Sequence, residues 1–245
     1  MRQLATHASG LVYEFWNTDI PRWMAVTSHL GILSGLKASR FYAMAHEPGS
    51  QWDYGIGIDW LGQVVEAVDG RRIDKFCQEE IFSPLGMTST ACEAEGALAT
   101  RLGSVSARGE KGQFGPFEIA PPAHPEFYGM GHTLYSTAGD HMRFLRMFLN
   151  KDVLDGNRVL SEKGVQTMQA NHIGDLRVGK LTTAVPPPSV LTLRHFRVRP
   201  KHIALVSCVR NKMCPACALR ARKPGRACST RTTGLTPPKM LRASS

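Results

Sequence analysis

The chain has 245 residues, a formal net charge of +10 and a hydrophobic fraction of 42%. These values fit one large or two small globular domains and exclude wholesale disorder or a collagen-like chain. No window approaches 18 consecutive apolar residues, which excludes a transmembrane helix. Residues 1–10 hold too short an apolar run for a secretory signal. Six cysteines do not make a disulfide scaffold in a chain of this length, so we expect reduced thiols and a cytoplasmic location.

The positive charge is concentrated at the C-terminal end. Residues 1–180 contain 17 Lys and Arg against 20 Asp and Glu, whereas residues 181–245 contain 13 Lys and Arg and no acid. The same 181–245 segment holds 8 of the 15 prolines and 4 of the 6 cysteines. This shift in composition predicts one domain over residues 1–180 and a separate basic tail, rich in Pro, Arg and Cys, over residues 181–245.

Three interpretations of the tail remain open. Its charge is typical of an arm that binds nucleic acid or an anionic surface, but such arms carry aromatic residues that stack on bases, and this one holds Phe196 alone. Cys214 and Cys217 form one C-x-x-C pair, yet tetrahedral zinc needs four ligands. The other candidate ligands have irregular spacing: His202, Cys208 and Cys228. The composition favours the third interpretation, a disordered segment or one translated out of frame, and we expect no nucleic-acid partner, no membrane, no metal and no cofactor.

Along residues 1–50, Gly and Pro predict loops between short segments. From Asp59 a helix is predicted, ending at Asp69-Gly70, with Asp59 as its cap. Its apolar residues recur at helical spacing: Leu61, Val64, Val65 and Val68. A second amphipathic helix follows and stops before Pro84. Its apolar stripe consists of Ile73, Phe76, Cys77 and Ile81.

Residues 88–131 show no period and predict turns and short strands. Thr137 is a good cap for a third helix, and Asp140, three residues on, can reach back to it as a variant of the capping box. The expected buried face of this helix consists of Phe144, Leu145, Phe148 and Leu149. Ser161 can cap a further short helix that carries Val165 and Met168.

Two short strings match motifs of serine acyl-transfer enzymes. Ser34 to Lys37 reads S-x-x-K, where the serine is a nucleophile and the lysine takes its proton from one helical turn away. His172 to Gly174 reads H-x-G, a variant of the third motif of the same enzymes. Gly35 and Pro48 argue against a firm helix around Ser34, and strings this short arise by chance, so both matches are weak. Dinucleotide, P-loop, zincin and α/β-hydrolase motifs do not occur.

Three longer blocks carry a stronger signal. They are "QLATHASGLVYEFWN" (3–17), "EPGSQWDYGIGIDWLGQVVEAVDGRRIDKFCQEEIFSPLGMTST" (47–90) and "GMGHTLYSTAGDHMRFLRMFLN" (129–150). In this order they resemble beta-lactamase-related serine hydrolases, a family of class C-type β-lactamases, carboxylesterases and acyltransferases. The resemblance implies an α+β fold, an antiparallel sheet flanked by helices with a helical region, and an active site between them. It also implies a small-molecule ester or amide substrate.

The resemblance places the family's catalytic tyrosine at Tyr54, in "WDYGIGID". In the family this residue exchanges a proton with the nucleophilic serine and the leaving group. Gly55 stands where Ser is usual. The family's own S-x-x-K lies upstream of the block that matches "ATHASG", and its third motif lies beyond residue 180, so Ser34 and Lys37 are in the wrong place to replace the nucleophile and its lysine. We expect an inactive fragment of such a hydrolase; the alternative is a non-catalytic binding protein whose basic tail contacts nucleic acid or anionic surfaces.

We interpret the other polar and aromatic residues near these blocks as structural. His7 and Ser9 favour a turn, and Trp52 and Trp60 are interpreted as packing anchors. The histidines at 132 and 141 are isolated in the sequence and predict no site.

Overall fold

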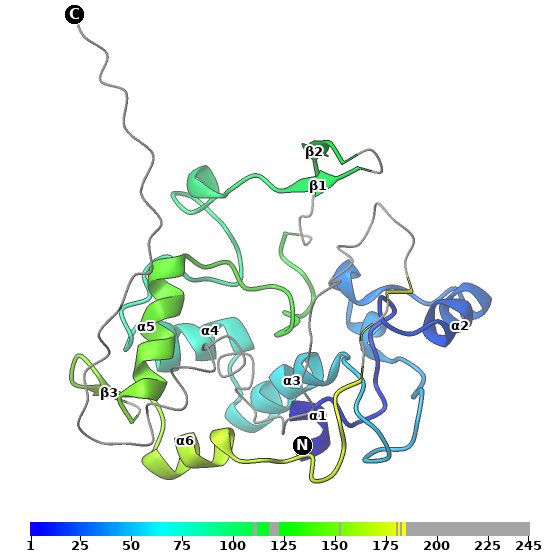
Figure 1. Ribbon diagram of the computed structural model, residues 1–245. Helices are drawn as coiled ribbons and strands as arrows, with labels where there is room; N and C mark the ends of the chain where they lie inside the picture. Colours follow the sequence, from blue (N-terminus) through cyan, green and yellow to red (C-terminus); the bar gives the residue numbers. More distant parts are fainter. Residues whose placement is uncertain (110–111, 118–122, 152, 180, 182, 185–245) are drawn as a thin grey trace, which may run out of the picture. The chain divides into compact units, whose positions relative to one another are not determined.

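A computed structural model describes residues 1–109, 112–117, 123–151, 153–179, 181, 183 and 184 (Figure 1). Every described residue lies within the first structural unit of the chain, Met1–Ser207. The predicted tail therefore lies outside the described residues apart from positions 181, 183 and 184. The zinc ligands considered for it lie outside as well: His202, Cys208, Cys214, Cys217 and Cys228.

Helices make up most of the regular structure in the described part of the chain. The α-helices are α1 (Arg2–Ala5), α2 (Asp19–Thr27), α3 (Gly57–Asp69), α4 (Ile73–Cys77), α5 (Ala138–Leu149) and α6 (Glu162–Gln169). The shorter turns of helix are η1 (Ile32–Ser34), η2 (Lys37–Arg40), the π-helical η3 (Gln78–Phe82) and η4 (Ala99–Arg101). No helix among the described residues is long and apolar enough to cross a membrane.

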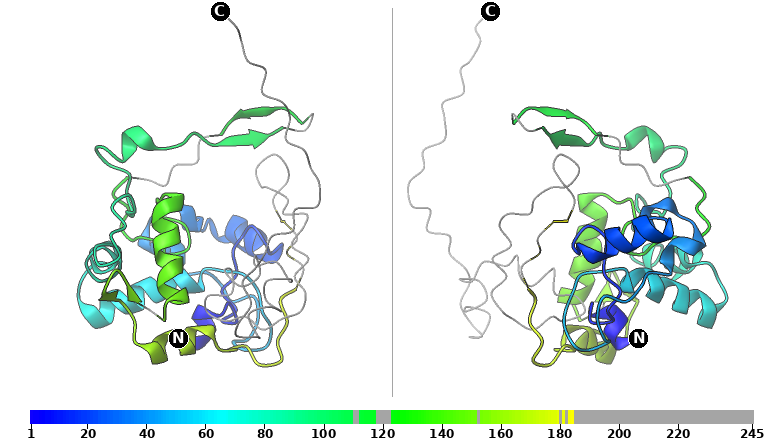
Figure 2. Two further views of the ribbon diagram at one scale, coloured as in Figure 1. Left: turned by 60° about the vertical axis from the view of Figure 1, so that its left-hand side comes forward. Right: turned by 90° about the vertical axis from the view of Figure 1, so that its right-hand side faces the viewer.

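Within the described residues, two small antiparallel sheets complete the α+β architecture. β1 (Ser106–Arg108) pairs with β2 (Phe114–Pro116), and β3 (Val153–Leu154) pairs with β4 (Asn157–Arg158). The β1–β2 hairpin, drawn in green in Figure 2, falls inside the 88–131 segment that predicted short strands. The sequence-based expectation for that segment is confirmed.

The ends of the helices follow from local sequence. Gly70 ends α3 with φ +88°, a left-handed conformation that glycine adopts without steric cost. At the start of α5 the Thr137 hydroxyl accepts a hydrogen bond from the Asp140 amide at 3.2 Å, and at α6 the Ser161 hydroxyl accepts from the Gly164 amide at 3.0 Å. The predicted stop and both predicted caps are therefore confirmed.

Two expectations about α5 are wrong. The Asp140 carboxylate does not complete a capping box; it accepts from the Ser89 amide at 2.7 Å and the Thr90 hydroxyl at 2.9 Å. Leu149 is 68% exposed, whereas Met147 is fully buried. The buried side of α5 thus consists of Asp140, Phe144, Met147 and Phe148. The hydrogen bonds from residues 89 and 90 to Asp140 hold the first turn of the helix against the loop near residue 90.

The apolar side chains form two clusters. The first gathers around α4, α5 and α6 and consists of Ile73, Cys77, Phe82, Leu85, Met87, Cys92, Tyr128, Met147, Phe148, Leu154 and Val165. The second consists of Val12, Tyr13, Ile20, Ile32, Tyr42, Ile56 and Phe127. Helix α3 packs on both, since Val65 contacts the first cluster and Trp60 the second. Figure 1 shows α3 beside α1, and a Cβ on Gly57 would lie 2.3 Å from the Leu4 carbonyl oxygen, so this close approach requires glycine.

Candidate active site

Tyr54 lies in the irregular segment that leads into α3. Its carbonyl oxygen accepts a hydrogen bond from the Tyr13 amide at 3.2 Å, and the preceding Asp53 amide donates to the His7 carbonyl at 3.0 Å. These bonds hold the segment around Tyr54 against residues 7–13, which belong to the first block of the family resemblance, residues 3–17. The backbone on both sides of Tyr54 is therefore fixed by contacts with a distant part of the chain.

The Tyr54 side chain is half-buried among aromatic rings. Its ring centroid lies 4.6 Å from that of His7 and 5.3 Å from that of Tyr13. Trp52 packs edge-on against His7, with ring centroids 6.0 Å apart. The rings limit the positions that the Tyr54 phenol can take, which is the positional control that a proton-transferring group needs.

His7 adopts a turn conformation, as the sequence indicates, but it also contacts Tyr54, which the sequence did not reveal. Its φ is +58°, and its Nδ1 atom accepts a hydrogen bond from the Gly55 amide at 3.3 Å. Burial lowers the pKa of His7 to about 4, and the negative charge of Asp59 offsets part of this effect. The imidazole is therefore neutral at physiological pH.

Acidification should destabilise the folded chain through His7. The pKa of His7 falls from 6.5 to about 4 on folding, so the unfolded chain binds more protons between these two values. Above pH 6.5 the imidazole is neutral in both states, and the free energy of unfolding has its full value. As the pH falls towards 4, the unfolded chain binds a proton on His7 that the folded chain does not, and the free energy of unfolding falls by roughly 3 kcal/mol. Urea unfolding at pH 7 and pH 4.5 measures it, with His7→Asn as the control for all other titrating groups. An equal pH dependence in both proteins would contradict the prediction.

Asp59 is fully buried and joins three segments. One carboxylate oxygen accepts from the Tyr13 hydroxyl at 2.9 Å and the other from the Gly131 amide at 2.8 Å. His132 Nδ1 lies 3.6 Å from the same carboxylate. Burial, together with the charge of Asp59, raises the pKa of Tyr13 far above its usual value, so Tyr13 remains a hydrogen-bond donor.

These contacts correct two expectations from the sequence. Helix α3 begins at Gly57, and the side chain of Asp59 makes long-range bonds and does not cap the helix. His132 is not isolated, since it adjoins Asp59, whereas His141 is exposed on α5. The two tryptophans are packing residues as predicted: Trp52 is buried, and Trp60 donates to the Arg40 carbonyl at 3.0 Å.

The S-x-x-K match does not lie on one helix. Ser34 ends η1, Gly35 follows with φ +72°, and Lys37 begins η2. The Lys37 side chain is exposed, and its amide donates to the Glu126 carboxylate at 2.8 Å. The doubt raised by Gly35 is thus confirmed, because the left-handed glycine interrupts the helical turn that would align the serine with the lysine.

The H-x-G match is part of the turn after α6. His172 Nε2 lies 2.5 Å from the Thr167 carbonyl oxygen of that helix. Ile173 is buried, and Gly174 has φ +59°. His172 thus contacts the last turn of the helix, and Ile173 and Gly174 have packing and turn roles.

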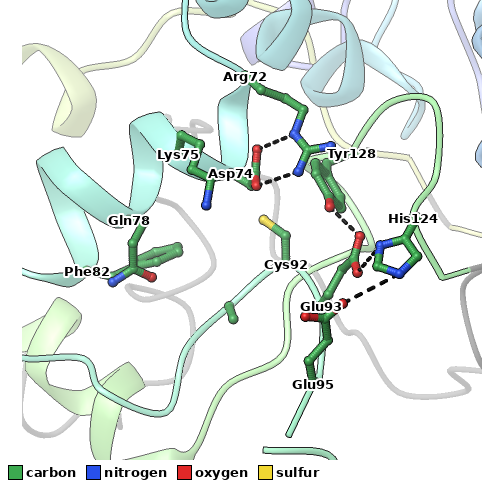
Figure 3. Close-up of a pocket in the computed structure, with 11 residues that line it drawn as sticks. Arg72, Asp74, Lys75, Gln78, Phe82, Cys92, Glu93, Glu95, His124 and Tyr128 are labelled. Atoms are coloured by element: carbon green, nitrogen blue, oxygen red, sulfur yellow. Dashed lines mark hydrogen bonds and ion pairs between the residues drawn. The ribbon is translucent and has the colours of Figure 1, made fainter.

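A separate pocket of about 370 Å³ lies beside α4 (Figure 3). Its lining includes Arg72, Asp74, Cys92, Glu93 and Tyr128. Arg72 forms an ion pair with Asp74 at 2.7 Å and lies 4.7 Å from the centre of the Tyr128 ring, and the Tyr128 hydroxyl donates to Glu93. Burial raises the pKa of Cys92 to about 12, so this cysteine is a neutral thiol and a poor nucleophile.

At the mouth of this pocket, Glu93, Glu95 and His124 bring metal-ligating atoms within 4.8 Å of one another. The two ring nitrogens of His124 face different carboxylates, Nδ1 at 3.1 Å from Glu93 and Nε2 at 3.7 Å from Glu95. One metal ion can use only one of these nitrogens. The His124 and Glu95 side chains are 77% and 66% exposed, an arrangement that suits ion pairs in contact with water.

Comparison with known proteins defines the class of the fold and then the family. The described structure is an α+β protein of the beta-lactamase/transpeptidase type. The beta-lactamase family profile matches residues 1–189, and the chain belongs to this family.

Several relatives are enzymes. The lovastatin esterase of Penicillium rubens is 30% identical over 196 residues, which are 77% of this chain and 48% of the esterase. Monacolin J acid methylbutanoyltransferase of Aspergillus terreus is 29% identical over 161 residues, 63% of this chain and 38% of the transferase. The structure of unliganded simvastatin synthase from Aspergillus terreus is similar with a TM-score of 0.60 and 26% identity, covering 72% of this chain and 43% of the synthase. This chain thus spans less than half the length of these relatives.

Proposed function

We propose that the chain contributes a proton-transferring tyrosine, Tyr54, to a serine acyl-transfer site that acts on small-molecule esters or amides. The observation that carries the proposal is the placement of the Tyr54 ring between His7 and Tyr13, on backbone held from both sides. Membership of the beta-lactamase family supplies the reaction class. The names of the esterase and the acyltransferase relatives favour an ester as the substrate.

In such a site a serine hydroxyl attacks the acyl carbonyl, an alcohol or amine leaves, and water or a second alcohol then takes the acyl group. As the phenolate, Tyr54 would accept the serine proton during attack, and as the resulting phenol it would return that proton to the departing oxygen or nitrogen. The surrounding rings leave the phenol few alternative positions, so its oxygen would remain directed at the reacting atoms.

We further propose that a protein consisting of these 245 residues is inactive by itself. Its one S-x-x-K string is Ser34–Lys37, and the two residues lie on separate turns of helix. The purified chain should hydrolyse p-nitrophenyl butyrate and a chromogenic β-lactam no faster than buffer. A fluorophosphonate adduct on Ser34, found by mass spectrometry and absent in Ser34→Ala, would overturn this prediction.

The role of Tyr54 is tested in a chimera in which residues 1–179 replace the matching segment of the lovastatin esterase, so that the sequence upstream of this segment, where the family carries its S-x-x-K, is kept. Tyr54→Phe should lower kcat by about 10²–10⁴-fold, the usual effect of losing a general acid or base. Tyr135→Phe, at a half-buried tyrosine that pairs with Ala91 through its backbone, is the matched control and should keep full activity. Equal activity of Tyr54→Phe and the unsubstituted chimera would exclude the proposed role.

A further inference from the structure

We propose that His7 is a positioning residue for Tyr54, which it holds through both flanking amides and through its ring. The functional consequence rests on the proposed role of Tyr54. The contacts themselves are independent of that role and can be tested in the chain as it stands.

One residue holds both neighbours of Tyr54. The carbonyl oxygen of His7 accepts from the amide of Asp53 at 3.0 Å, and its side-chain Nδ1 accepts from the amide of Gly55 at 3.3 Å. Between these two bonds the His7 ring lies 4.6 Å from the Tyr54 ring, at an interplanar angle of 56°. Backbone and side chain of Tyr54 are therefore restrained by the same residue.

The backbone conformation of His7 makes this double contact possible. With φ +58° the residue is left-handed, a conformation that a residue other than glycine adopts at some cost in free energy. The surrounding contacts maintain it: Trp52 packs edge-on against the ring, and Gly49 donates to the carbonyl of the next residue, Ala8, at 2.7 Å. Asn tolerates a left-handed backbone better than other side chains, and Gly tolerates it without cost.

The hydrogen bond defines the protonation state of the ring. A nitrogen that accepts a hydrogen bond carries no proton, so His7 is the neutral tautomer with its hydrogen on Nε2. The groups that face the ring are the Trp52 and Tyr54 rings, the Gly55 amide and, by its charge, Asp59. Burial keeps the pKa near 4, so the acceptor is present throughout the neutral pH range.

The first test is direct. Long-range ¹⁵N–¹H NMR of the full chain at pH 7 should show His7 with Nδ1 unprotonated and Nε2 protonated. A protonated Nδ1, or rapid exchange between tautomers, would overturn the proposal without any substitution.

The second test distinguishes two roles of residue 7, the hydrogen-bond acceptor Nδ1 and the left-handed backbone conformation. His7→Gly keeps the left-handed backbone but removes the acceptor and the ring, whereas His7→Asn keeps the backbone preference and an oxygen close to the position of Nδ1. Hydrogen exchange of the Gly55 amide should accelerate about tenfold in His7→Gly, as expected for one lost hydrogen bond, and should return to near the wild-type rate in His7→Asn. Equal rates in the wild type and His7→Gly, or equal acceleration in both variants, would overturn the role of Nδ1.

The matched control is His124→Asn, at another left-handed histidine with φ +51° in the separate pocket; it should leave the Gly55 and Tyr54 signals unchanged. In the esterase chimera, His7→Gly should lower kcat about tenfold with little change in KM, and His7→Asn, which regains the acceptor but not the ring, should restore part of the loss. If Tyr54→Phe leaves the chimera fully active while the NMR results hold, the proposed function fails and the positioning contact stands. If the NMR results fail, the contact is excluded whatever the activity.

Discussion

Gly55→Ala should destabilise the folded chain by about 3 kcal/mol or more, because backbone atoms occupy the space that a Cβ would need. That Cβ would lie 1.8 Å from the Leu11 carbonyl oxygen and 2.6 Å from the Val12 Cα. Neither atom can move aside by a side-chain rotation, so residues 11–13 or the segment around Tyr54 must shift. The shift would also disturb the bond from the Tyr13 amide to the Tyr54 carbonyl.

Urea unfolding of the full chain measures this loss. Gly139→Ala is the matched control, since its Cβ would lie in helix α5 with the nearest atom, the Thr137 hydroxyl oxygen, at 3.8 Å. Alanine favours a helix over glycine, so this control should gain roughly 0.5 kcal/mol. If Gly55→Ala unfolded at the wild-type urea concentration, the close approach of residues 11 and 55 would be wrong.

Asp59→Ala should destabilise the fold by about 3 kcal/mol, because the buried Tyr13 hydroxyl and the partly buried Gly131 amide lose their acceptor. The Tyr13 hydroxyl and the Gly131 amide both depend on this carboxylate. Removing it leaves both donors without their acceptor and loosens the link between residue 13, helix α3 and the loop at residue 131. The cost exceeds that of a single surface hydrogen bond because Asp59 is fully buried.

Asp59→Ser distinguishes this role from helix capping. Serine is as good a cap as aspartate, so if Asp59 capped α3 the substitution would cost little. The serine hydroxyl is too short to replace both bonds of the carboxylate, and we expect a loss close to that of Asp59→Ala. Val68→Ala, 83% exposed on the same helix, is the control and should change the free energy of unfolding by less than about 0.5 kcal/mol. A wild-type midpoint for Asp59→Ser would restore the capping interpretation.

Local sequence determined helices α3, α5 and α6 and how they begin or end, whereas it predicted loops where α1 and α2 lie. Helix α3 follows from the spacing of its apolar residues and ends at Gly70; α5 and α6 begin at Thr137 and Ser161, whose hydroxyls cap them. These features depend on residues within one or two turns of each other, so the sequence contains the information that decides them. The family resemblance, which rests on longer blocks, indicated Tyr54 and the α+β class.

The tertiary structure alone decided what surrounds Tyr54. Asp59 bonds to Tyr13 across 46 residues and to Gly131 across 72, and His7 reaches Gly55 across 48. In the same way Asp140 bonds to residues 89 and 90 instead of capping its own helix. A buried carboxylate or imidazole takes whichever partners the fold brings to it, because leaving it unpaired costs more than a cap contributes. The spacing of residues along the sequence does not predict partners that lie so far apart in the chain. For this reason the sequence indicated the tyrosine but not the residues that hold it.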